Sequence, residues 1–133
     1  MAVVITSTLC AEMVLAAESA VPLECCGLLL GKGDTVTSIL PSANISDTPE
    51  SAFLIDPAVL AKAQRAARQG GLDILGYYHS HPNGRREPSQ RDRAEAIPDG
   101  RLWAIIAAGE VRFWRSEQCN GETIFVPQKR TKP

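Results

Sequence analysis

The sequence predicts an α/β protein in which a mixed β-sheet is flanked by helices within a single domain. Short apolar runs rich in β-branched and aromatic residues recur along the chain, and turn-forming residues bound them. Stretches with helical spacing of apolar residues interrupt these runs, and strands interleaved with helices favour a layered sheet. With 133 residues, of which 44% are hydrophobic, the chain fits one domain with a sizeable core. We expect this domain to span 1–133, with its core over about 3–127 and a flexible basic tail at 128–133.

The first half of the chain predicts four strands and two helices. The strands are expected at 3–5, 25–30, 35–40 and 52–55. The first helix takes its N-cap from residues 6–8 and ends at about Ser19. The second helix follows the cap residue Asp56, begins at Pro57, and ends at Gln69 before two glycines.

The second half predicts four more strands and one short helix. The strands are expected at 73–79, 102–107, 111–114 and 123–126. A turn-rich loop at 82–88 separates the first of these strands from the helix, which begins at Ser89 and is stopped before Pro98. No repeat or linker interrupts this pattern, so a single domain is expected.

The two histidines of the chain, His79 and His81, lie one residue apart at the end of an apolar strand. Side chains repeat every two residues along a strand, so both imidazoles point to the same face. Two converging imidazoles can serve as two ligands of a metal ion. Asp92 offers a third, oxygen ligand, which leaves the fourth position of a tetrahedral zinc open to water.

Ser89 and Asp92 also have a simpler interpretation as a helix start. They are three residues apart, and a serine followed three residues later by an acid resembles a capping box. The same spacing places both side chains on one face of the first helical turn. The nearby pair of histidines favours a metal site over a cap alone.

These residues resemble the motif of the JAMM (MPN+) metalloprotease family. In that motif a His-x-His pair is followed after ten residues by an aspartate, with a serine three residues before it, as His79, His81, Asp92 and Ser89 are here. The family also has an upstream glutamate in a Pro-x-Glu-x-Cys-Gly context, which residues 22–31 match around Glu24. The resemblance extends from about residue 5 to about residue 126.

Membership of this family would imply a cytidine-deaminase-like layered fold and a zinc site. The resemblance assigns His79, His81 and Asp92 to the metal, and it assigns the role of general base to Glu24. Ser89 would donate a hydrogen bond to the oxyanion of the tetrahedral intermediate. A plain alternative for Glu24 is a solvated acid in the connection between a helix and a strand.

The resemblance implies a metallopeptidase that cleaves after the C-terminal Gly-Gly of a ubiquitin-like β-grasp protein. The chain is similar to the small stand-alone bacterial members, so we expect it to process a sulfur-carrier protein. One alternative is an isopeptidase that deconjugates a bacterial ubiquitin-like modifier. Another is a non-catalytic MPN scaffold, although such domains usually lack a ligand that this chain retains. A zinc deaminase would need His-x-Glu and Pro-Cys-x-x-Cys, which the sequence does not contain.

Composition bounds the partners and the compartment. The formal net charge is −1, which gives no indication of binding to nucleic acid or to a membrane surface. The sequence has no signal-peptide pattern and no apolar run long enough to cross a membrane, so a cytoplasmic protein is expected. The four cysteines lack the C-x-x-C spacing of a zinc knuckle. The sequence leaves open whether the chain forms a homo-oligomer.

Overall fold

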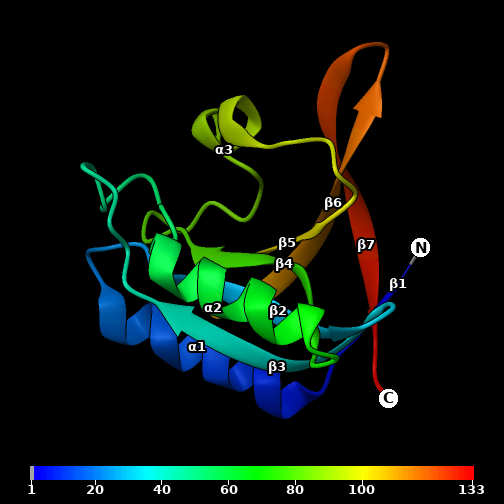
Figure 1. Cartoon of the computed structure of the whole chain (residues 1–133). Coiled ribbons are helices and arrows are strands. Elements are labelled where there is room, and N and C mark those ends of the chain that lie inside the picture. Colours follow the sequence, from blue (N-terminus) through cyan, green and yellow to red (C-terminus); the bar gives the residue numbers. More distant parts are fainter. Residues whose placement is uncertain (1) are drawn as a thin grey trace.

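Seven strands form a mixed sheet that curls until its two edges meet through β1. A computed structural model describes residues 2–133, and within them the strand order is β1-β3-β2-β4-β5-β6-β7 (Figure 1). The strands are β1 (Ala2–Val4), β2 (Cys26–Lys32), β3 (Thr35–Ser42), β4 (Asp73–Ser80), β5 (Leu102–Ala107), β6 (Glu110–Cys119) and β7 (Glu122–Thr131). β1 pairs in parallel with both β3 and β7, which closes the sheet.

Within the described residues, three helices accompany the sheet, and each has a side-chain cap. They are α1 (Ser7–Ala20), α2 (Pro57–Arg68) and α3 (Gln90–Glu95). Thr6, Asp56 and Ser89 each accept a hydrogen bond from a backbone N–H of the first turn, which satisfies a donor that the helix leaves unpaired. Figure 1 shows α1 and α2 packed along the sheet, whereas α3 stands apart near the β6–β7 hairpin. No helix in residues 2–133 is long and apolar enough to cross a membrane.

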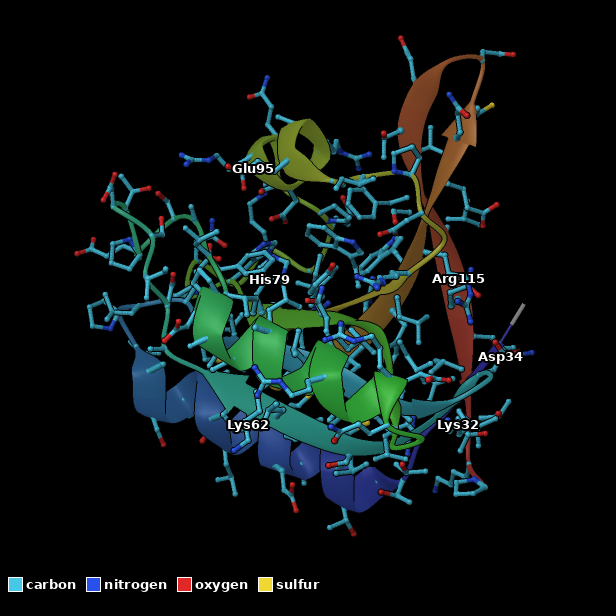
Figure 2. The ribbon with its side chains drawn as sticks, viewed as in Figure 1. Lys32, Asp34, Lys62, His79, Glu95 and Arg115 are labelled. Atoms are coloured by element: carbon cyan, nitrogen blue, oxygen red, sulfur yellow. The ribbon has the colours of Figure 1, made fainter. Side chains whose placement is uncertain are left out.

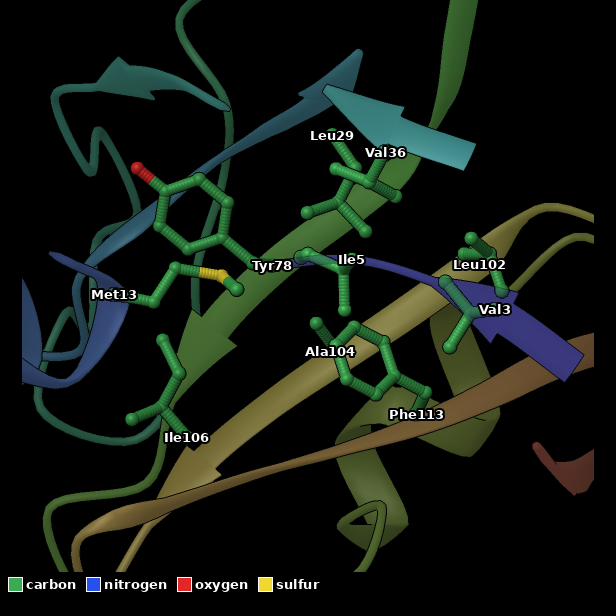
Figure 3. Close-up of a cluster of buried hydrophobic side chains, with 10 residues drawn as sticks. All are labelled: Val3, Ile5, Met13, Leu29, Val36, Tyr78, Leu102, Ala104, Ile106 and Phe113. Atoms are coloured by element: carbon green, nitrogen blue, oxygen red, sulfur yellow. The ribbon is translucent and has the colours of Figure 1, made fainter. Parts of the chain in front are cut away.

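The core is divided by the alternation of side chains along the strands. Tyr78 on β4 and Ala104 on β5 belong to a cluster with Met13 of α1 (Figure 3). Their neighbours Tyr77 and Trp103 belong to the other clusters, on the side of the sheet that carries α2 and α3. His79, two residues after Tyr77, therefore points to this second side.

The tyrosines and tryptophans all lie on strands of the sheet, β4, β5 and β6. Tyr78, Trp103 and Trp114 are buried, while Tyr77 is partly exposed. The hydroxyl of Tyr77 accepts a hydrogen bond from Arg101 at 2.8 Å.

The strand predicted at 52–55 is wrong. Only Ile55 forms a bridge there, with Asn44, and the rest of the segment is extended without a partner strand. The side chain of Asn44 supplies the hydrogen bonds that a neighbouring strand would have supplied, since it donates to the carbonyl of Ala52 and accepts from the N–H of Leu54. Apolar residues of this segment are therefore buried without pairing to a neighbouring strand.

The last strand also extends beyond the residue where the sequence predicts its end. β7 continues to Thr131, so most of the expected flexible tail at 128–133 is strand. The reason is long-range pairing, because residues 129–131 lie beside β1 at the other end of the chain. The basic residues of this segment show no local hydrophobic pattern that would have revealed the pairing.

Gly27 on β2 is required for close packing between strands. A Cβ at this position would overlap the ring of Tyr78 and the backbone carbonyl of Leu40. We expect Gly27→Ala to lower the free energy of unfolding by about 2 kcal/mol, because the buried ring must shift from a packed position. Urea denaturation would measure the change, and a variant as stable as the wild type would contradict the packing described here.

Candidate metal centre

Three side-chain atoms converge at the end of β4. The Nε2 atoms of His79 and His81 are 3.1 Å apart, and each lies 3.1 Å from Oδ2 of Asp92. All three residues are buried, and Figure 2 shows His79 in the interior of the molecule. The structure therefore brings together the three residues that the sequence predicts as metal ligands.

Hydrogen bonding at His81 fixes the tautomer of its neutral ring. Nδ1 of His81 lies 2.8 Å from the carbonyl oxygen of Arg85, which can only accept, so Nδ1 is the donor. In the neutral ring Nε2 is then unprotonated and faces the carboxylate oxygen of Asp92, which is also an acceptor. Two acceptors in a buried site repel each other unless a proton or a metal ion is shared between them.

The spacing of the three atoms fits a small metal ion. Zinc bonds to histidine nitrogen and carboxylate oxygen are about 2.0–2.1 Å, so the ligands of a tetrahedral ion lie roughly 3.3 Å apart. The 3.1 Å edges of the triangle are close to this separation. Two imidazoles and a carboxylate form a donor set typical of transition metals rather than of magnesium or calcium.

Asp92 is at once a helix-capping residue and a member of the triangle. Its Oδ2 accepts from the backbone N–H of Ser89 at 2.9 Å, and Oγ of Ser89 accepts from the N–H of Asp92 at 3.0 Å. This is a complete capping box at the start of α3. The cap and the metal site are therefore one structure, because the capping box fixes the carboxylate that faces the histidines.

The electrostatics of the triangle follow from burial and mutual contact. Burial lowers the pKa of His79, which favours the neutral ring that a metal requires. Burial also acts to lower the pKa of His81, but contacts with Asp92 and the Arg85 carbonyl raise it overall. Burial disfavours the charged form of Asp92, yet its hydrogen bonds to both histidines hold its pKa well below the usual range.

Glu24 is a buried acid without a partner for one of its oxygens. Its side chain is 5% exposed, and Oε1 forms no hydrogen bond within residues 2–133. Burial raises the pKa of Glu24 to about 7; His81 and Arg91 counteract this rise, and Asp92 adds to it. The alternative of a solvated acid is therefore wrong, because Glu24 is buried. A carboxyl group with a pKa near neutrality is suited to accept and release a proton.

The backbone of Glu24 is held from two directions. Its N–H donates to the carbonyl of Pro49 at 2.8 Å, and its carbonyl accepts from the Asn44 side chain at 3.0 Å. The next residue, Cys25, donates its N–H to Oγ of Ser80 at 2.8 Å. Ser80 thus points away from the metal triangle, as strand alternation predicts, and it ties the Glu24 segment to β4.

A cleft of about 340 Å³ joins these groups. Glu24, His81 and Ser89 line it together. The cleft is also lined by residues that the sequence did not single out: Glu50, Ser51, Asn83, Gln90 and Arg91. These residues carry no motif, and only the folding of the segments around residues 50, 83 and 90 places them at one opening.

A second, more apolar groove of about 470 Å³ adjoins the cleft. Arg91 lines both hollows, so they are neighbours. Phe53, Tyr77 and Trp103 form much of the groove wall. Phe53 has no signal in the sequence that connects it with the metal, because it precedes His79 by 26 residues and lies in a segment of ordinary apolar composition.

Comparison with known proteins identifies the family. Residues 6–117 match the family described as prokaryotic homologs of the JAB domain. The chain belongs to this family. It is 37% identical to a desampylase of Haloferax volcanii over 67% of this chain and 73% of that protein. It is 43% identical to a probable TtuB-protein conjugate cleaving protease of Thermus thermophilus over 56% of this chain and 50% of that protein.

Solved structures agree with this assignment. A protein of Desulfitobacterium hafniense superposes with a TM-score of 0.80 at 26% identity, covering 98% of this chain and 92% of the other. A JAB1/MPN domain protein of Archaeoglobus fulgidus has the same fold, with a TM-score of 0.61 at 19% identity, covering 98% and 97%. The predictions of JAMM membership, of the layered α/β fold and of an enzyme are confirmed. The roles of the individual site residues stay predictions.

The raised pKa of Glu24 predicts a stability cost in the metal-free protein. The folded state favours the protonated form of the Glu24 carboxyl group. The folded protein therefore has its full stability below pH 4.5, and part of its free energy of unfolding is lost as the pH rises through about 7. Glu24→Gln removes this titration. We expect metal-free Glu24→Gln to match the wild type at pH 4.5 and to exceed it by about 2 kcal/mol at pH 8.5, measured by urea unfolding.

Glu50→Gln provides the control, because Glu50 lines the same cleft but is exposed. This variant should differ little from the wild type at either pH. An equal gain in stability for Glu50→Gln, or none for Glu24→Gln, would contradict the account of Glu24 as a buried, destabilised acid.

Proposed function

We propose that the protein is a zinc metallopeptidase that cleaves the bond following the C-terminal Gly-Gly of a ubiquitin-like β-grasp protein. The observation that carries the proposal is the triangle of His79, His81 and Asp92, of which His81 lines the same cleft as the unpartnered acid Glu24. A bound zinc ion would supply an activated water and a Lewis acid for the scissile carbonyl. A scaffold that acts only by binding would not need the destabilised Glu24.

In this proposal Glu24 moves the proton. Its Oε1 has no competing donor in the structure, so it is free to accept a proton from water and pass it to the leaving amine. Both histidines are engaged in the triangle and cannot serve. The hold of Asn44 and Pro49 on the Glu24 backbone keeps the carboxylate inside the cleft.

Ser89 supplies a hydroxyl beside the same cleft. Its Oγ accepts from the N–H of Asp92, which leaves the hydroxyl hydrogen available for donation. We propose that this hydrogen is donated to the oxyanion that develops on the substrate carbonyl. Such a donor commonly contributes a factor of about 10² to 10³ in turnover.

The form of the substrate is suggested by relatives. One relative is named as a protease that cleaves TtuB–protein conjugates, which favours an isopeptide bond to a lysine of a target protein. The substrate expected from the sequence is instead a peptide bond in a sulfur-carrier precursor, where extra residues follow Gly-Gly. Both substrates present the same extended Gly-Gly tail, so one cleft can bind either.

Zinc-loaded protein should be tested against two matched substrates. One is a β-grasp carrier extended beyond Gly-Gly by a peptide bond, and the other is the same carrier joined to a lysine ε-amine. Mass spectrometry should show release of a carrier that ends in Gly-Gly from at least one substrate. If neither substrate releases this carrier, although the protein holds one zinc ion, the proposal is overturned.

The metal assignment predicts one zinc ion per chain. His79→Ala with His81→Ala should abolish stoichiometric zinc, whereas Glu24→Gln should retain it and lose turnover, because Glu24 is assigned as a base and not as a ligand. Metal analysis of chelator-free preparations measures the zinc content of both variants. Retention of one zinc ion in the double variant would refute the ligand assignment.

Ser89→Gly separates capping from catalysis. Glycine is a tolerated N-cap residue, so the helix should lose only a few tenths of a kcal/mol, and the bond from the backbone N–H of residue 89 to Asp92 is retained. Without the hydroxyl, turnover should fall about 100-fold. Thermal melting and turnover are measured on the same preparation, and near-normal turnover would return Ser89 to a purely structural role.

A further inference from the structure

The two histidines of the metal centre are oriented in different ways. Nδ1 of His81 donates to the carbonyl of Arg85 at 2.8 Å. Nδ1 of His79 is buried and has no hydrogen-bond partner among residues 2–133. Metal-binding histidines almost always donate their second ring N–H to an acceptor, and this bond fixes the tautomer and the direction of the ring. A different contact must therefore orient His79.

Aromatic packing supplies that contact. The ring of Phe53 stacks on the ring of His79 with centroids 4.2 Å apart and planes inclined by 19°. Trp103 meets His79 edge-on, with centroids 5.7 Å apart and an angle of 88°. The imidazole cannot turn without displacing these two larger rings, which are packed against each other.

Phe53 is itself held in place by its neighbours. The side chain of Asn44 donates to the carbonyl of Ala52 at 2.9 Å and accepts from the N–H of Leu54 at 3.1 Å, so residues on both sides of Phe53 are fixed. The same Asn44 side chain donates to the carbonyl of Glu24. The segment that carries Phe53 is thus tied to the rest of the active site.

We propose that Phe53 is a positioning residue for the metal centre. Its ring holds Nε2 of His79 toward Asp92 and His81, in place of the hydrogen bond that is missing at Nδ1. The inference rests on the proposed function, because it takes His79 as a metal ligand. Phe53 also lines the 470 Å³ groove, so a substrate segment in this groove would contact the ring that orients the ligand.

Metal binding tests the inference without reliance on turnover. Zinc affinity is measured by competition with a chromophoric chelator, and the visible spectrum of the cobalt-loaded protein reports the coordination geometry. Phe53→Leu should weaken zinc binding by about 10-fold and alter the cobalt spectrum, as loss of an orienting partner does. Phe53→Tyr keeps the stacked ring and should match the wild type in both measurements.

Leu54→Ala is the matched control, because Leu54 is the next residue and its side chain is 53% exposed. It should leave zinc affinity and the cobalt spectrum unchanged. Phe53→Met is measured in parallel and, like Phe53→Leu, should weaken zinc binding. Melting of the metal-free protein detects a folding defect in either variant, and the variant that folds then provides the test.

Two results would overturn the inference. One is wild-type zinc affinity and cobalt spectrum in the folded variants that lack the ring. The other is an equal loss of affinity in Leu54→Ala, which would indicate general loosening of the segment. A wild-type protein that binds no zinc would instead overturn the proposed function, so the two failures are distinguishable.

Discussion

The convergence of two imidazole nitrogens and one carboxylate oxygen on one buried point is the constraint on which the rest of the structure depends. The Nε2 atoms of His79 and His81 and Oδ2 of Asp92 form a triangle with 3.1 Å edges. Such an arrangement is unfavourable unless a proton or a metal ion is shared between the atoms, because buried acceptors would otherwise face one another. The surrounding segments each contribute an interaction that holds one of the three side chains in place.

The interactions that hold the three side chains in place are of different types. His79 lies on β4 and His81 follows its last residue, and the carbonyl of Arg85 fixes the tautomer of the neutral His81 ring. The capping box of α3 fixes the carboxylate of Asp92, so a local rule of helix initiation serves the metal site. His79, which has no such polar partner, is held by aromatic packing. Burial raises the pKa of Glu24, as is expected where a group is kept ready for proton transfer.

The three converging residues and the buried Glu24 could be singled out from the sequence because they lie in short motifs. His79 and His81 are adjacent on one strand face, and Asp92 follows within one loop and one helical turn, so local geometry sufficed. The caps at Asp56 and Ser89 were predicted for the same reason. The structure shows that the two interpretations of Ser89 and Asp92, cap and metal site, are compatible.

The errors have a common cause in long-range contacts. The segment around Phe53 has the composition of a strand, but its partner is the side chain of Asn44 rather than a neighbouring strand. The end of β7 is strand only because β1 lies beside it. The contact between Phe53 and His79 likewise joins separate segments, and no pattern of spacing encodes it.

A crystal structure of the zinc-loaded protein, with anomalous scattering measured at the zinc edge, tests the central claim most directly. The account predicts one strong peak within about 2 Å of Nε2 of both histidines and of Oδ2 of Asp92, with the bond from the N–H of Ser89 to Asp92 preserved. A peak at another site, or coordination of His79 through Nδ1, would contradict it.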